Sequence, residues 1–289
     1  MQVLAALCFL VLAHLPPLRG EVVKSFESNA QCLDFFYKRM VPKWDAANPN
    51  SRNTACLCQR FNNRYHFATL YNKEHRIAVY SAYLFQTSDN KSTKNDWCIE
   101  PQLVDRSWDK DMEEEKELEI KHKGVYFGQN QSLDEDYIDS DYDRGHLNPK
   151  QHHREDSRQA TFTLTNVVPQ NRTLNQGAWK KYETDLQKNL TKCSQAYVLV
   201  GAIPSKNNLI NNRVNVPDYI WNAYCCLDNN GRPISSGGAI ARNTENEVVR
   251  HTLSELKTLL KEYTKSKVLV LFRDKCEAKR SIIRYLGVC

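Results

Sequence analysis

Two short runs in different parts of the chain constrain it more than any other feature. The first, Asp143–His146, places an arginine two residues before a histidine, and the second carries Asn175 and, eight residues later, Glu183. A histidine can deprotonate water near neutral pH, an arginine can neutralise a phosphate, and amide and carboxylate oxygens suit a divalent cation. In this order, the runs predict a metal-dependent site for cleaving phosphodiester bonds.

The sequence around the second run predicts a strand, a loop and a helix. Residues 162–168 alternate between apolar and polar side chains, so they predict a strand that Pro169 ends. Residues 174–188 have helical spacing. On a helix of 3.6 residues per turn, Asn175 and Glu183 lie about 80° apart, so both can present oxygens to one side. The apolar side of the helix is formed by Trp179, Tyr182 and Leu186.

Elsewhere the chain predicts more strands than helices. Residues 64–71 and 76–85 are rich in aromatic and β-branched side chains and are separated by a polar turn, which favours a hairpin. The charged stretch 108–123 predicts a solvated helix or loop, and residues 253–260 predict an amphipathic helix. Further strands are predicted at 196–202, 221–227, 238–242 and 267–272. The expected fold class is α+β, with a mainly antiparallel sheet and flanking helices.

These runs resemble a known family of nucleases. Residues 143–146, residues 166–179 and Glu183 resemble, in order and spacing, the DNA/RNA non-specific endonuclease family, whose core is the ββα-metal motif. Weaker matches are found at 197–201 and 216–221. The resemblance covers roughly residues 60 to 275, so we expect an endonuclease domain there, built on a ββα-metal core.

The resemblance also implies roles for individual residues. Asn175 would be the direct protein ligand of one Mg²⁺ (or Mn²⁺), and Glu183 would hold a water on that ion. His146 would take the proton of the attacking water. Arg144 would place positive charge near the scissile phosphate, and Asn166 would help to orient the site. The products would carry 5′-phosphates.

The substrate-binding residues depart from the family at one place. The family often has a second arginine after the early hairpin, where this chain offers Lys94. An ammonium lacks the bidentate fork of an arginine, so the phosphate would be held less tightly. Arg172 and Lys180 belong to a group of basic residues around the site that either follows a nucleic-acid backbone or is simply solvated. The other members of this group are Lys150, Arg154, Arg158 and Lys181.

Overall charge neither supports nor opposes a nucleic-acid substrate. The formal net charge is +6, and phosphate binding depends on local patches more than on the total. No base-reading motif is visible, so DNA and RNA without strong sequence preference are the expected partners. Asp143 is expected to be a structural hydrogen-bond acceptor, and His152 and His153 are expected to be solvated.

The N-terminus predicts export. Residues 3–15 form an apolar run too short to span a membrane, and Gly20 offers a small residue for cleavage, so residues 1–20 predict a signal peptide. No long apolar run follows, so we expect no stable membrane insertion and a secreted protein, extracellular or endolysosomal. Residues 21–59 would form a cysteine-containing extension, and residues 276–289 a C-terminal tail.

Cysteines and sequons agree with that compartment. Without Cys8, the ten cysteines become nine, and they are dispersed along the chain, which favours disulfides. An odd number leaves either one free thiol or a bond to a protein partner. The adjacent Cys225 and Cys226 are expected to serve two different bridges, because a vicinal disulfide is strained. Glycosylation sequons begin at Asn90, Asn130, Asn171 and Asn189.

Two functions from different classes remain open at this point. One is a secreted Mg²⁺-dependent endonuclease, which the presence of His146, Asn175 and Glu183 favours. The other is a secreted binding or immune-interaction protein that keeps the nuclease fold with little activity.

Overall fold

The structure is a computed structural model that describes residues 22–89, 91, 92, 94 and 96–276. The predicted signal peptide, most of the predicted C-terminal tail and the sequon at Asn90 lie outside these residues. Cys8 and Cys289 lie outside them as well.

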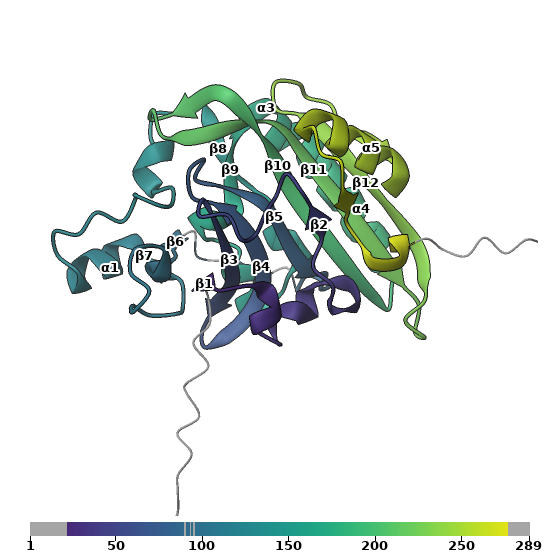
Figure 1. Ribbon diagram of the computed structural model, residues 1–289, viewed down its shortest axis with the longest axis horizontal. Coiled ribbons are helices and arrows are strands. Elements are labelled where there is room, and N and C mark those ends of the chain that lie inside the picture. The colour runs from purple at the N-terminus through teal and green to yellow at the C-terminus, as the bar shows by residue number, and fades with distance from the viewer. Residues whose placement is uncertain (1–21, 90, 93, 95, 277–289) are drawn as a thin grey trace, which may run out of the picture.

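An eight-stranded antiparallel sheet forms the middle layer of the protein (Figure 1). Its strand order is β1-β3-β4-β5-β10-β11-β12-β13. The strands are β1 (Val22–Val23), β3 (Thr54–Phe61), β4 (Arg64–Asn72), β5 (Ile77–Leu84), β10 (Gln195–Ile210), β11 (Val214–Leu227), β12 (Pro233–Arg242) and β13 (Val249–His251). Strand β3 crosses position 60, so the sheet of the endonuclease domain also uses residues of the predicted N-terminal extension.

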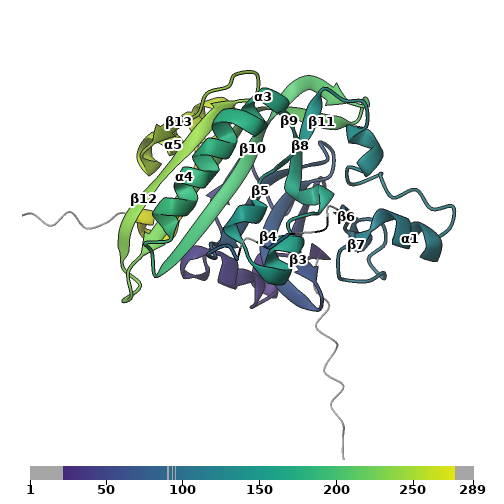
Figure 2. The same cartoon turned by 180° about the vertical axis from the view of Figure 1, so that it is seen from behind.

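Three pairs of shorter strands surround the sheet. They are β2 (Lys43–Trp44) with β14 (Leu269–Val270), β6 (Cys98–Ile99) with β7 (Glu113–Glu114), and β8 (Tyr142–His146) with β9 (Val167–Asn171). The pair β6–β7 and the helix that follows it lie at one side of the molecule, beyond the edge of the large sheet in both views (Figures 1 and 2).

Helices cover both faces of the sheet. Helix α4 lies across one face, together with β8 and β9, as Figure 2 shows. Helix α5 and the N-terminal 3₁₀ helices cover the opposite face. The helices are α1 (Glu115–Lys121), α2 (Glu155–Gln159), α3 (Arg172–Leu174), α4 (Lys180–Leu190) and α5 (Leu253–Thr264), and the 3₁₀ helices include Phe26–Ser28, Cys32–Phe35, Tyr37–Arg39, Pro101–Leu103, Asp134–Tyr137, Lys150–His152, Leu164–Asn166 and Arg273–Cys276.

Each face has its own hydrophobic core. The apolar side of α4 packs with the strand pair β8–β9 over one face, and that of α5 packs over the other. The first core includes Tyr182, Leu186 and Leu190, and the second includes Leu253, Leu256 and Leu260. Burial of apolar area of this kind is what holds both layers to the sheet.

Most predicted elements are confirmed. The fold class is α+β, the predicted hairpin is formed by β4 and β5, and the charged stretch contains α1. The helix predicted at 253–260 is α5. Of the strand predicted at 267–272, only β14 forms, and it pairs with β2 rather than with the large sheet.

The strand predicted at 162–168 was wrong. Residues Leu164–Asn166 form a 3₁₀ turn, and the strand begins only at Val167. The Asn166 side chain bonds to the backbone of neighbouring segments, which competes with a strand ladder. Pro169 does not end the strand but lies inside β9, opposite Arg144, and a two-stranded sheet tolerates a residue without an N–H.

The predicted disulfide pattern is largely confirmed. Cys225 and Cys226 serve two different bridges, to Cys276 and Cys193. A third bridge joins Cys32 to Cys58. Cys56 and Cys98, the unpaired cysteines within the described residues, are buried, so neither is placed to bond a partner protein.

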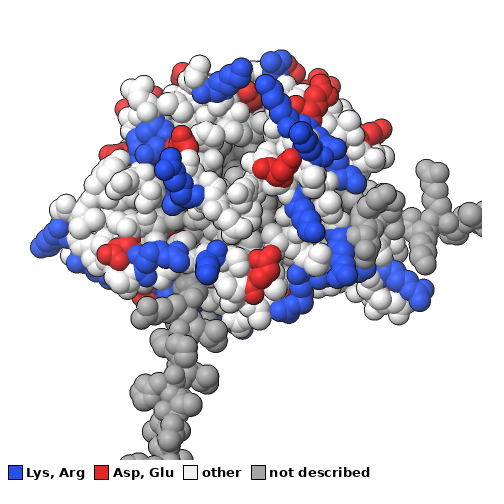
Figure 3. All heavy atoms as spheres, in the orientation of Figure 1, with Lys and Arg blue, Asp and Glu red and all other residues white. Residues whose placement is uncertain are grey.

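The surface charge is mixed. On the face drawn in Figure 3, Lys and Arg side chains are interspersed with Asp and Glu side chains. Among the residues that the structure describes, no helix is long and apolar enough to cross a membrane.

Candidate active site

The strand pair β8–β9 carries the first predicted run. His146 is the last residue of β8 and pairs with Val167. Gly145, just before it, lies so close to Gln170 that an added Cβ would meet the Gln170 Oε1 at 2.2 Å and its Cβ at 2.5 Å. Because Gln170 is fully buried, only glycine fits at this position.

The His146 ring rests against two aromatic rings. Its centroid lies 5.3 Å from that of Trp97 and 5.0 Å from that of Phe162. Burial lowers the pKa of His146 from its ordinary value of 6.5, and the nearby charge of Lys150 lowers the pKa further. The imidazole is therefore neutral at pH 7, which is the form that accepts a proton.

Asn166 is fully buried, and its side chain binds the backbone of Asn148, two residues after His146. Its Oδ1 accepts the N–H of Asn148 at 3.0 Å and the hydroxyl of Ser81 at 3.1 Å. Its Nδ2 donates to the carbonyls of Asn148 and Thr161 at 2.9 and 3.0 Å. With two bonds at each end, the amide has no position left for a substrate. Asn166 therefore fixes the backbone after His146, as expected of a residue that would orient the site, and has no hydrogen-bonding position free for a substrate.

Asn175 is tied to the first run through Asp143. The Nδ2 of Asn175 donates to the Asp143 carboxylate at 2.9 Å, and Gln176 donates to the same oxygen at 2.8 Å. The other Asp143 oxygen lies 3.4 Å from the Nε of Arg172. Because the amide nitrogen of Asn175 is engaged, its Oδ1 is the end that remains for a cation.

The helix around Asn175 differs from the one that the sequence predicted. Residues Asn175–Trp179 form a π-helical turn between α3 and α4, with non-helical φ and ψ at Gly177. The expected angle of about 80° between Asn175 and Glu183 assumed 3.6 residues per turn and does not apply across this turn. π-turns are frequent at functional sites.

An exposed side chain supports the π-turn. The Oδ1 of Asn246 accepts the N–H of Ala178 at 2.8 Å, and it would lie 2.6 Å from a Cβ at Gly177. The loop that carries Asn246 follows β12, far from the site in the sequence. The sequence therefore gave no signal for this contact.

Glu183 lies on α4 and is tied to the chain after His146. Gln151 donates from its Nε2 to the Glu183 carboxylate at 3.1 Å. Burial raises the pKa of Glu183 above its ordinary value of 4.5, and the side chains of Trp179 and then Gln151 oppose this rise. A nearby cation would favour the charged carboxylate.

His152 and His153 are buried, so the expectation that they are solvated was wrong. The Nε2 of His152 lies 3.1 Å from the Glu183 carbonyl, which can only accept, so this nitrogen carries the proton. The Nδ1 then accepts from the hydroxyl of Tyr83 at 2.8 Å. The polar composition of this loop predicts exposure to solvent, whereas the loop packs between β5 and α4.

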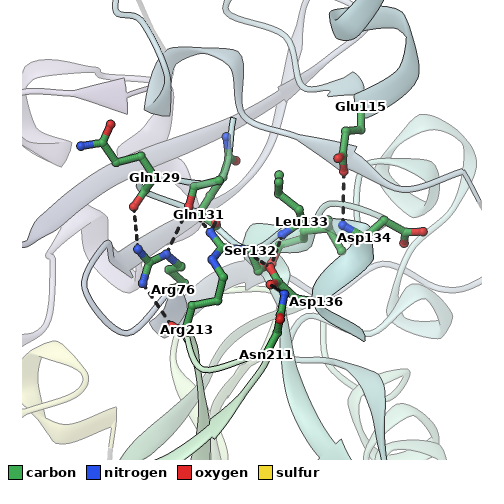
Figure 4. Close-up of polar contacts among 12 residues, drawn as sticks. Arg76, Glu115, Gln129, Gln131, Ser132, Leu133, Asp134, Asp136, Asn211 and Arg213 are labelled. Atoms are coloured by element: carbon green, nitrogen blue, oxygen red, sulfur yellow. Dashed lines mark hydrogen bonds and ion pairs between the residues drawn. The ribbon is translucent and has the colours of Figure 1, made fainter. Parts of the chain in front are cut away.

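Arg144 is engaged by an acidic partner. Its Nη2 lies 2.6 Å from an Asp134 oxygen, and its guanidinium lies over the rings of Trp97 and Tyr137. The segment around Asp134 is held in place by Arg213, which forms an ion pair with the fully buried Asp136 (Figure 4). A phosphate at Arg144 would therefore compete with Asp134.

The other predicted basic residues differ in what they contact. Arg172 is exposed and faces Asp143, and Lys180 is exposed on the first turn of α4. Lys94 is exposed, and its backbone carbonyl accepts a hydrogen bond from Gln159. Arg158 is buried and pairs with Asp89, so it supports the fold instead of a substrate.

The residues fit a weakly held divalent cation. Within the described residues, no group of three His, Cys, Asp or Glu side chains could hold a metal. The donors are instead one amide oxygen, from Asn175, and one half-buried carboxylate without a basic partner in the described structure, from Glu183. Mg²⁺ suits such a set because it keeps several of its waters. Within the described residues, no hydrogen bond or ion pair joins His146 directly to Asn175 or Glu183.

A family model of DNA/RNA non-specific endonucleases matches residues 51–277. This chain belongs to that family. The predicted resemblance is therefore confirmed, and it begins somewhat earlier than the expected position 60.

The predicted secretory N-terminus and the cysteine-rich flanks look most like animal proteins named endonuclease domain-containing 1, and two of these proteins are similar to this chain. The mouse protein (Mus musculus) is 35% identical over 68% of this chain and 38% of its own length. The human protein (Homo sapiens) is 33% identical over 72% of this chain and 41% of its own. The chain thus spans about two fifths of the length of these relatives.

A solved structure shows the same fold. An EndoG chain, solved in complex with EndoGI to explain EndoG inhibition, aligns with a TM-score of 0.53 over 78% of this chain and 88% of that chain. The two sequences are 16% identical, so the likeness concerns the fold alone. The fold is that of the ββα-metal nucleases.

Proposed function

We propose that this protein is a secreted, Mg²⁺-dependent endonuclease that hydrolyses DNA and RNA without strong sequence preference. One arrangement carries the proposal: residues 143–151 are tied to the helix of the site at two points. Asp143 bonds to Asn175, and Gln151 bonds to Glu183, with His146 between these two anchors. The residues proposed as proton acceptor and cation ligands thus lie on segments that are bonded to each other.

In the proposed reaction, the neutral His146 imidazole accepts a proton from the water that attacks phosphorus. The bond from phosphorus to the 3′ oxygen breaks, and this oxygen leaves with a proton taken from water, so the products carry 5′-phosphates. Arg144 exchanges Asp134 for the phosphate, and Asn166 keeps the backbone after His146 fixed. Asn175, through its Oδ1, and Glu183, through a water molecule, would hold the cation. A bound Mg²⁺ (or Mn²⁺) supplies positive charge that stabilises the transition state.

Export to an oxidising compartment is supported by the disulfides. Three bridges lie within the described residues, and such bonds are rare in the cytosol. Expression in animal cells tests this part: the full chain should reach the medium with its N-terminal residues removed. Retention inside the cell in a reduced form would contradict it.

Cleavage assays test the enzymatic part. Purified protein should cut plasmid DNA and RNA with Mg²⁺, should stop with EDTA, and should lose activity in His146→Ala. Equal inactivity of the wild type and His146→Ala in every divalent cation would overturn the proposal. A binding protein with a nuclease fold is the second candidate, and the ion pair that Asp134 forms with Arg144 favours it.

A further inference from the structure

The site as described has only one arginine next to His146, and Asp134 engages it. Among the other cations near the site, Arg172 faces Asp143 and Arg158 is buried with Asp89. A phosphate at this site would therefore be neutralised more fully if a further cationic side chain lay next to His146. The sequence suggested Lys94. In the structure its backbone carbonyl accepts a hydrogen bond from Gln159, and no ion pair within the described residues joins its side chain to the site.

Lys150 lies where such a cation is needed. Its Nζ is 5.5 Å from the centroid of the Phe162 ring, and that ring is 5.0 Å from the His146 ring. Arg144 lies over Trp97, the other ring that packs against His146. The two cations thus lie over the two rings that flank the proton acceptor.

Charge and exposure agree with this position. Burial is the main cause of the lowered pKa of His146, and the nearby positive charge of Lys150 lowers this pKa further, in keeping with the position of its ammonium. The Lys150 side chain is exposed. Within the described part of the chain, no acidic residue forms an ion pair with it, in contrast to Arg144 and Arg172.

The backbone beneath Lys150 is held firmly. Gln151 bonds to Glu183 through its side chain and accepts a hydrogen bond from Gln187 at its carbonyl, 2.9 Å away. His152 bonds to Tyr83 and to the Glu183 carbonyl. Both residues after Lys150 are therefore fixed to the helix of the site, so little backbone ordering is needed when a phosphate binds.

We infer that Lys150 is a phosphate-binding residue of this site, which contacts the phosphodiester backbone of DNA or RNA beside His146 and takes the place of the missing second arginine. The inference rests on the proposed function for its substrate class. It does not depend on turnover, because contact with a phosphate can be measured without cleavage.

The test measures binding in the His146→Ala background, with a fluorescent oligonucleotide in Mg²⁺ over a range of KCl concentrations. Adding Lys150→Ala should weaken binding about tenfold. It should also make the slope of log Kd against log salt shallower by about 0.7 to 0.9, the value for one lost phosphate contact. Lys150→Arg should restore both. Lys265→Ala, which removes an exposed charge at the end of α5 on the other face, should leave both unchanged.

The same substitutions in the active protein give a second measurement. Lys150→Ala should lower kcat/KM about tenfold or more, with a thermal midpoint equal to that of the wild type. An unchanged affinity and salt slope in Lys150→Ala, or equal losses in Lys150→Ala and Lys265→Ala, would overturn the inference. If Lys150→Ala made the slope of log Kd against log salt shallower but the wild type showed no cleavage activity, the phosphate-binding role of Lys150 would be upheld and the proposed function refuted.

Discussion

The Asp143 carboxylate accepts a hydrogen bond of 2.9 Å from the Nδ2 of Asn175. This contact joins the strand that ends in His146 to the helix that carries the proposed cation ligand. It also fixes which end of the Asn175 amide faces outward, because a carboxylate can only accept. The roles of neighbouring residues in the site therefore depend on Asp143, although it would touch neither metal nor substrate.

Asp143→Ala should weaken the response to Mg²⁺. Without the carboxylate, the Asn175 amide can rotate, and loss of a partner that orients a metal ligand typically costs about 10- to 100-fold in metal affinity or activity. Mg²⁺ titrations of cleavage should show partial rescue at high concentration. Asp141→Ala, which removes an exposed carboxylate two residues away, is the control. Equal Mg²⁺ requirements in both variants would contradict the orienting role.

Asn175→Ala should be more damaging than Glu183→Ala. The first removes the proposed direct protein ligand, whereas the second removes a carboxylate proposed to act through water, so its loss should be limited to about 10- to 100-fold. Raised Mg²⁺ should partly rescue Glu183→Ala alone. If Glu183→Ala were the less active variant and no Mg²⁺ concentration restored it, the two roles would have to be exchanged.

His146→Ala should abolish cleavage while leaving the fold intact. Loss of a general base typically costs about 10² to 10⁴ in rate. His146 is a half-buried residue at the end of β8, outside the large sheet, so its replacement should change the melting curve little. Activity below a hundredth of wild type with an unchanged circular-dichroism melt is the expected result. Retention of more than half of the activity would exclude His146 as the base.

Gly145→Ala should destabilise the protein itself. The new methyl would lie 2.5 Å from the Cβ of the buried Gln170, and overpacking of this kind typically costs about 1 to 3 kcal/mol or more. Denaturant unfolding measures the loss. Adding Gln170→Ala should recover only part of it, since the Gln170 Cβ itself remains. A Gly145→Ala variant as stable as wild type would contradict the close approach of the two strands.

Much of this fold was predictable because its signals are local. The hairpin β4–β5 and helix α5 follow from side-chain alternation and helical spacing within a few residues. The site residues were predicted for a different reason, since the order and spacing of two short runs resemble the family, and their roles stay predictions. The relative positions of Asn175 and Glu183 could not be predicted, because the expected angle of about 80° between them assumed an unbroken α-helix.

The contacts that shape the site are long-range, and the sequence does not encode them locally. Asn246 supports the π-turn from a loop after β12, and Asp134 engages Arg144 from a turn held by Arg213. Likewise, a polar loop does not reveal that His152 is enclosed by β5 and α4. These contacts depend on tertiary packing, which the local propensity of a segment does not predict.

The buried His152 makes the stability of the protein depend on pH. Burial lowers the pKa of His152 to about 4, whereas in the unfolded chain it returns to 6.5. Between these two values, the unfolded chain binds a proton that the folded protein does not. The free energy of unfolding should therefore fall on acidification from pH 6.5 to 4, by up to about 1.4 kcal/mol per pH unit from this residue.

His152→Gln isolates this contribution. Glutamine can still donate to the Glu183 carbonyl and does not titrate, whereas Glu183, whose raised pKa acts in the opposite direction, is present in both proteins. The variant should be less stable than wild type at pH 7, and the difference should shrink as the pH falls towards 4. Urea unfolding of both proteins at pH 7.0, 6.0, 5.0 and 4.5 measures it. A difference that stays constant over this range would show that His152 takes up its proton without unfolding.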